Sequence, residues 1–206
     1  MRAPSGTASP NIQQPRPPQR QRGRERVAAL MESAAMLFVE KGFDATTMTE
    51  IAARAGASIG TLYLFFPTKE ALAQGILTGR AEDLSARLDG LRASCKGVAP
   101  AAIADLLFSE LGGFLAEHPV YAALLDLPGD PGWRHSLRAR RRGEIAALFA
   151  DADPALPVAQ VERLATIVPQ LMRIPLMSGD GEKQRKGVIE ELRLMLRRHL
   201  ETPSHD

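Results

Sequence analysis

The stretch Thr46–Lys69 carries residue types at the spacing of a helix-turn-helix. Ala52 is small enough to let two helices cross closely, Gly56 stands where the turn requires a positive φ, and Leu62 supplies an apolar anchor for the second helix. Such a unit leaves its second helix free to enter a major groove. The chemistry predicted for this stretch is therefore DNA recognition. An ordinary helical hairpin with a glycine turn is the alternative.

Basic side chains collect in the first third of the chain. Residues 1–69 hold nine Lys and Arg against five Asp and Glu, whereas residues 70–206 hold 17 against 19. Residues 1–23 are rich in proline and poor in apolar side chains, which predicts a disordered basic arm. Two interpretations of this arm stay open: a solubilising leader, or a segment that lies on nucleic-acid phosphates or in a minor groove.

The elements that position these residues are predicted to be helices throughout, because apolar residues recur at helical spacing and no convincing strand is present. Thr47 and Glu50 form a capping box, and Ser58 and Thr68 are expected N-caps. The helix that begins after Thr68 is expected to reach about Leu91. The later helices are expected at residues 100–117, 119–127, 132–150, 157–177 and 183–201.

A family resemblance rests on three segments of this region. They are Gly42–Phe43, the run T-T-M-T-E-I-A-A-R-A-G, and the run S-I-G-T-L-Y-L-F-F-P-T-K-E-A-L, whose last seven letters, Phe66–Leu72, are the most specific. With these segments the chain resembles the TetR family of bacterial transcriptional regulators. The resemblance implies an all-α fold: a DNA-binding domain at 24–70, a larger helical domain for ligand binding and dimerisation at 71–201, and a frayed tail at 202–206.

The candidate DNA contacts lie in and before the helix-turn-helix. Thr47 stands at a helix N-terminus, where backbone N–H groups favour phosphate. Tyr63 and Lys69 resemble the family's backbone-contacting tyrosine and lysine, and Thr61 can bond a base edge or a phosphate. Ile59 departs from the family pattern, as does Leu64, and Ile59 could pack on a thymine methyl instead of donating to guanine. The full set is Arg24, Thr47, Ser58, Ile59, Gly60, Thr61, Tyr63 and Lys69.

Large apolar residues between positions 100 and 177 either fill a core or line a cavity for a largely apolar small molecule. Arg141 interrupts the apolar stripe of its helix, so it could snorkel at the edge, pair with an acid or meet a ligand carboxylate. The candidate ligand residues are Phe108, Leu111, Phe114, Tyr121, Trp133, Arg141 and Met172.

The last two long helices carry apolar stripes wider than one contact requires, and such surfaces either lie buried inside one chain or face a partner. A homodimer is favoured, because two helix-turn-helix units then read two half-sites of an operator. The expected interface residues are Val161, Leu164, Val168, Leu171, Leu192, Met195 and Leu196.

No catalytic motif, metal-ligand spacing or cofactor motif is found, so an enzyme is not expected and Cys95 is interpreted as an inert thiol. No membrane span or signal segment is present, which favours a cytoplasmic protein. The leading hypothesis is a repressor that a small-molecule ligand releases from a double-stranded DNA operator. A ligand-independent helix-turn-helix regulator or DNA-organising protein is the alternative. A third hypothesis is a helical binding protein or enzyme with a vestigial DNA-binding head, which the basic arm argues against.

Overall fold

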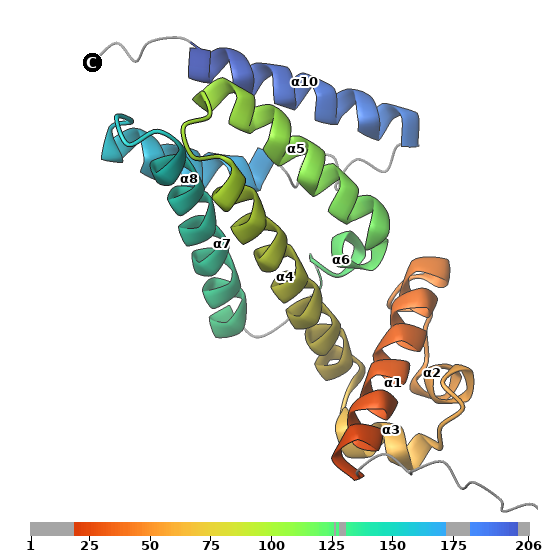
Figure 1. Ribbon diagram of the computed structural model, residues 1–206. Helices are drawn as coiled ribbons and strands as arrows, with labels where there is room; N and C mark the ends of the chain where they lie inside the picture. Colours follow the sequence, from red (N-terminus) through yellow and green to blue (C-terminus); the bar gives the residue numbers. More distant parts are fainter. Residues whose placement is uncertain (1–18, 126, 128–130, 172–181, 202–206) are drawn as a thin grey trace, which may run out of the picture.

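The computed structural model describes residues 19–125, 127, 131–171 and 182–201, and every regular element within these ranges is a helix (Figure 1). The all-α prediction is thereby confirmed. The helices are α1 (Gln19–Lys41), α2 (Met48–Arg54), α3 (Ile59–Phe65), α4 (Lys69–Ser94), α5 (Pro100–Glu117), α6 (Pro119–Leu124), α7 (Pro131–Ala152), α8 (Val158–Leu171) and α10 (Glu182–Glu201).

The first three helices form a small head around their own apolar centre. α1 packs on α2, and α2 packs on α3. Leu30, Ile51 and Leu62 are fully buried there. Phe66 completes this core, whereas the neighbouring Phe65 keeps 38% of its surface exposed. Leu62, which the sequence predicts as the apolar anchor of the second helix, is therefore part of this core.

The turns of the head follow the local sequence signals. Thr47 closes both halves of a capping box with Glu50, and the Ser58 hydroxyl accepts from the backbone N–H of Thr61. Gly42 ends α1 at φ +86°, and Gly56 makes the helix-turn-helix turn at φ +62°. A side chain at either glycine would be strained, because L-residues rarely adopt a left-handed backbone.

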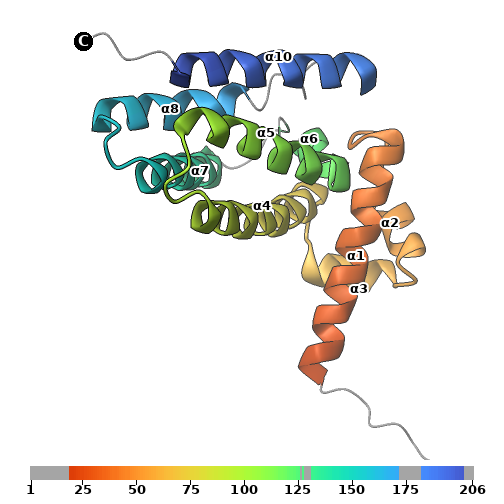
Figure 2. The ribbon, with the colours of Figure 1, turned by 45° about the horizontal axis from the view of Figure 1, so that its top comes forward.

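α4 joins the head to the rest of the molecule (Figures 1 and 2). At its start, the Phe66 ring lies against Gly75, where an added Cβ would come within 3.2 Å of the ring. Further along, α4 packs on α5, α6 and α7, while α6 also contacts α1. The head is thus attached through α4 and supported by a second contact from α6.

The C-terminal helices form the larger bundle. α7 packs extensively on α4 and α8, and α10 lies along α5 at the end of the molecule far from the head (Figure 2). This arrangement leaves a space between α4, α5, α7 and α8.

Several element boundaries differ from the sequence prediction. α1 begins at Gln19, so residues 19–23, expected to belong to a disordered arm, are helical. α4 continues to Ser94, three residues beyond the expected end, while α6 stops at Leu124. The arm before residue 19, the end of the helix predicted at 157–177, and the tail at 202–206 lie outside the described residues.

Candidate DNA-binding surface and ligand cavity

Helix α3 packs against the head through one face and exposes the opposite face to solvent. Leu62 is fully buried in the core of the head, where α3 packs on α2. Ile59 and Tyr63 stand exposed on it, with 40% and 50% of their surfaces accessible. Leu64 is exposed even further, at 78%. The open face of α3 therefore presents two apolar side chains and a phenol, an unusual composition for a surface that faces only water.

Two of the predicted DNA contacts, Ser58 and Thr61, hydrogen-bond to each other. The Ser58 and Thr61 hydroxyl oxygens lie 2.9 Å apart, and the Ser58 hydroxyl also accepts from the Thr61 backbone N–H at 3.1 Å. Thr61 is half-buried, whereas Ser58 and Gly60 are exposed. A hydroxyl can donate and accept at once, so this pair retains capacity for one further partner.

The first turns of α1 carry the uncompensated positive charge of the head. Arg22, Arg24 and Arg26 are all exposed, and none forms an ion pair with a residue that the structure describes. Arg24 and Phe65 line the same shallow hollow, so the start of α1 lies beside α3. Arg22 and Arg26 were not among the predicted contacts. The sequence shows this cluster of arginines, but it assigns Arg22 to the disordered arm.

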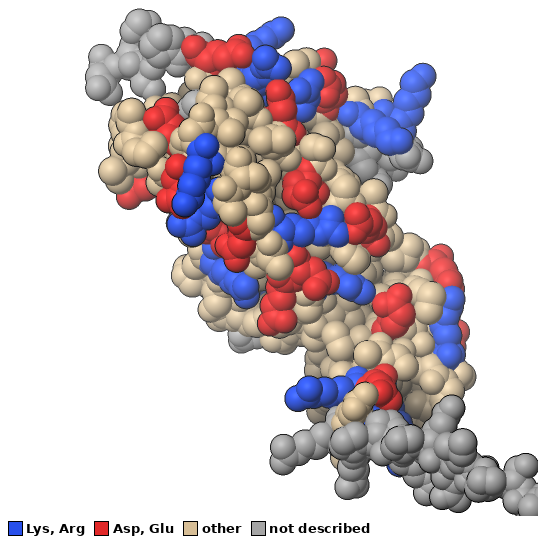
Figure 3. All heavy atoms as spheres, in the orientation of Figure 1, with Lys and Arg blue, Asp and Glu red and all other residues tan. Residues whose placement is uncertain are grey.

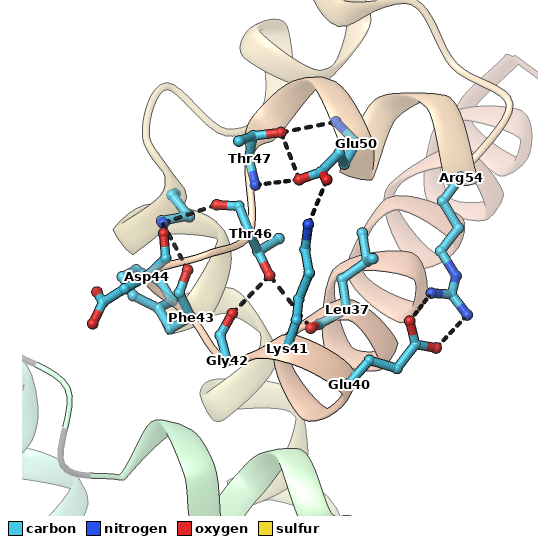
Figure 4. Close-up of polar contacts among 11 residues, drawn as sticks. Leu37, Glu40, Lys41, Gly42, Phe43, Asp44, Thr46, Thr47, Glu50 and Arg54 are labelled. Carbon is cyan, nitrogen blue, oxygen red and sulfur yellow. Dashed lines mark hydrogen bonds and ion pairs between the residues drawn. The ribbon is translucent and has the colours of Figure 1, made fainter.

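Other cations of the head are neutralised by neighbouring carboxylates (Figure 4). Arg54 donates both terminal nitrogens to Glu40, at 2.6 and 2.7 Å, and Lys41 pairs with Glu50. The Lys41 ammonium, followed by the hydroxyl and backbone N–H of Thr47, lowers the pKa of Glu50 to about 2. Thr47 thus shares the N-terminus of α2 with a carboxylate, which disfavours a phosphate at the same position.

The structure gives Lys69 a different role from the one expected. Its ammonium donates to the carbonyl oxygens of Phe43, Thr46 and Asp44, at 2.7, 2.9 and 3.3 Å, and lies 4.4 Å from the Phe43 ring centroid. Figure 4 shows these carbonyl groups turned towards one nitrogen. An ammonium has three donors, and all three are used here. The prediction of Lys69 as a phosphate contact is corrected: it ties the loop between α1 and α2 to the start of α4.

A cavity of about 150 Å³ lies between α4, α5, α7 and α8. Its walls are mainly leucine, isoleucine, valine and alanine side chains, with Tyr121 and Trp133 among them. Four arginines of α7 also reach it: Arg134, Arg138, Arg141 and Arg142.

Of the predicted ligand residues, Leu111, Tyr121, Trp133 and Arg141 line this cavity. Phe108 and Phe114, also predicted, are buried in the core and do not line this cavity. The Phe114 ring instead packs edge-on against Tyr121, at 5.2 Å between centroids. Met172 lies outside the described residues.

Arg141 pairs with an acid, which is one of the three possibilities considered for it. One of its terminal nitrogens lies 2.7 Å from the Glu144 carboxylate, and the other donates to the Ala81 carbonyl of α4 at 3.3 Å. Arg141 therefore bridges the cavity wall to the helix that carries the head.

Sequence models of known families cover both parts of the molecule. A model described as "Bacterial regulatory proteins, tetR family" matches residues 30–76. A second, described as "Tetracyclin repressor-like, C-terminal domain", matches residues 100–200. The chain belongs to the TetR family. Its relatives include HTH-type transcriptional repressors.

Individual relatives match part of the chain. The HTH-type transcriptional repressor KstR2 of Rhodococcus jostii is 46% identical over 55 residues, which are 27% of each chain. The HTH-type transcriptional repressor KstR of Mycobacterium tuberculosis is 26% identical over 141 residues, or 68% of this chain and 55% of that one. The matches thus span less than two thirds of these curated relatives.

Solved structures of the TetR family share the whole fold. A putative TetR-family regulator from Mesorhizobium loti superimposes with a TM-score of 0.66 at 17% identity, and covers 87% of this chain and 97% of that one.

Most of the residues expected at a TetR dimer interface are buried within the single chain, and the prediction is wrong for them. Val161, Leu164 and Val168 face the chain's own core on α8, and Leu192 and Leu196 do so on α10. Leu171 is half-buried and packs against the same core. The sequence shows that these helices are broadly apolar, but not which side of each faces inward.

The outward faces of the same helices keep other apolar residues. Met195 on α10 is 62% exposed, and Val158 and Ile167 on α8 are 75% and 48% exposed. Of the predicted interface residues, Met195 alone is openly available to a partner.

The part of the chain that the structure describes offers few other features that could bind a metal, span a membrane or act as a nucleophile. No group of three or more His, Cys, Asp or Glu residues there could hold a metal ion, and no helix there is long and apolar enough to span a membrane. Cys95 is buried, and its burial raises the pKa of the thiol. Such a thiol is a weak nucleophile.

Proposed function

We propose that the protein is a transcriptional repressor that binds double-stranded DNA as a homodimer and releases it when a small molecule fills the cavity. The arrangement of helices α1–α3 in the head is the observation that most strongly supports DNA binding. A buried Leu62 fixes α3 so that Ile59 and Tyr63 face outward, while Arg24 lines a hollow with Phe65 at the end of α3 and has no ion-pair partner among the described residues. A fixed helix with a cation beside it suits a major groove and its flanking phosphates.

The cavity supports ligand control of this binding. It borders α4, and Arg141 of its wall bonds to the Ala81 carbonyl of that helix. A ligand that changes the position of the wall therefore acts on the helix that carries the head. This favours the ligand-responsive repressor over the ligand-independent regulator. If it is correct, ligand and DNA weaken each other's binding by the same factor.

A homodimer is proposed through the outward faces of α8 and α10, around Ile167 and Met195. These large apolar side chains are exposed in the single chain. Two-fold pairing there would place one head at each side of the dimer, as two half-sites of an operator require.

The proposal is tested by fluorescence anisotropy on a duplex from the gene's own promoter, as a function of salt. The variant Arg24→Gln should bind more weakly and lower the slope of log K against log salt by about one unit, since each phosphate contact contributes about 0.9. Lys96→Gln, which removes an exposed charge just beyond the far end of α4, is the matched control and should leave the slope unchanged. An equal response of both variants, or no preference for the promoter over unrelated DNA, would contradict the proposal.

A further inference from the structure

The cavity has an unusual electrostatic composition. Its four arginines, at positions 134, 138, 141 and 142, follow the spacing of a single helical face on α7. No described carboxylate lines the cavity beside them. The surface of the bundle is different: on the face in Figure 3, basic and acidic side chains are interspersed over the C-terminal helices.

Three of these four arginines have no acid to balance them among the described residues. Arg141 is neutralised by Glu144, which also accepts from Arg140. Arg138 and Arg142 form no ion pair there. Arg134 makes a single bond, to the Leu125 carbonyl at 3.3 Å, and its Nε is buried with no hydrogen-bond partner in the described structure.

A buried donor without a partner is costly, and a cation beside an apolar cavity is more so. Both costs are removed by an anion that enters with an apolar body. A carboxylate suits the site because it can accept two parallel bonds from a guanidinium.

We propose that the effector is an amphipathic carboxylate, with its head group on Arg134 and its apolar body in the cavity. Arg138 and Arg142 add positive potential at the same end. This inference rests on the proposed function, and deepens it by naming the ligand class. The cavity volume of about 150 Å³ matches that of an engineered apolar cavity in another protein that binds benzene, so the apolar body has about the size of a phenyl ring.

The probe is 3-phenylpropanoate, compared by calorimetry with its uncharged amide and with acetate, on the full-length protein. The acid should bind at least about tenfold more tightly than the amide, because charge-assisted bonds to arginine are roughly twice as strong as neutral ones. Acetate, which lacks the apolar body, should bind far more weakly than the acid.

Arg134→Met should bring the affinity for the acid down to that of the amide and leave the amide unchanged. Arg163→Met removes an exposed charge from α8 outside the cavity lining, and should change neither. If Arg134→Met fails to fold in a thermal melt, the exposed pair Arg138→Gln/Arg142→Gln provides the second test, with a smaller loss of acid preference. Equal binding of acid and amide, or no binding of the acid at millimolar concentration, would overturn the inference.

Failure of this inference is distinguishable from failure of the proposed function. Promoter binding is measured without any ligand, so intact promoter binding together with an absent acid preference rejects only the ligand class. Acid binding that leaves promoter affinity unchanged supports the chemistry of the cavity and rejects its role as an effector site.

Discussion

Replacing Lys69 with methionine tests the role that the structure gives this residue. The change keeps the length of the side chain but removes the ammonium, and with it the bonds to the partly buried Phe43 and Thr46 carbonyls. Each of these bonds contributes about 1 kcal/mol, and the cation–π contact with the Phe43 ring about 0.5–1 kcal/mol more. The bond to the exposed Asp44 carbonyl is neglected, because water replaces it. We expect the free energy of unfolding to fall by about 2–3 kcal/mol in urea denaturation followed by circular dichroism.

The matched control is Lys41→Met, in the same head. Its ammonium pairs with Glu50 at the surface, so the loss of stability should be much smaller. The second readout is the salt dependence of promoter binding, measured under conditions where both variants are folded. Lys69→Met should leave the slope unchanged, since its three donors are already used within the chain. A slope lower by about 0.9 with unchanged stability would refute this reasoning and restore Lys69 as a phosphate contact.

Two further predictions concern assembly and pH. Met195→Glu should convert a homodimer into a folded monomer, as measured by sedimentation velocity. Leu192→Glu places its charge in the chain's own core, so it should lower the melting temperature sharply. A Met195→Glu variant that is folded and still dimeric would exclude this interface. The Glu50 carboxyl should titrate near about 2 in carbon NMR, below its ordinary value of 4.5. Because its pKa is depressed in the folded state, its stabilising contribution is complete above about 4.5 and is lost as the pH falls towards about 2. A carboxyl that titrates at its ordinary value would show that the bonds from Lys41 and Thr47 do not persist in solution.

The features that the sequence predicted well are those set by neighbouring residues. The capping box of Thr47, the N-cap of Ser58 and the positive φ of Gly56 involve only local backbone and side-chain chemistry. The buried position of Leu62 follows from its spacing within one short helix. These local signals were sufficient to define the helix-turn-helix and the all-α fold.

Features that depend on distant parts of the chain could not be predicted in the same way. The Lys69 ammonium bonds to carbonyls 23 to 26 residues earlier, and no local pattern encodes such contacts. The sequence leaves three roles open for Arg141, and only the fold shows that it bonds to Glu144 and to the Ala81 carbonyl. The apolar stripe on α10 was visible, but only packing on α5 shows that Leu192 faces inward and Met195 outward.

The attachment of the head to α4 has a mechanical consequence. Lys69 and the contact between Phe66 and Gly75 fix the first turns of α4 to the head, so the two must turn together. At 1.5 Å per residue, the part of α4 from Lys69 to Leu84, which lines the cavity, makes a lever about 22 Å long. A tilt of about 5° at the cavity would carry the head through about 2 Å. In the proposed dimer two such levers would change the separation of the heads by up to twice that distance, a misfit of about one eighth of the 34 Å between half-sites one turn apart. A side-chain rearrangement at the cavity is therefore amplified by length alone, and neither head has to unfold or change shape to leave its operator.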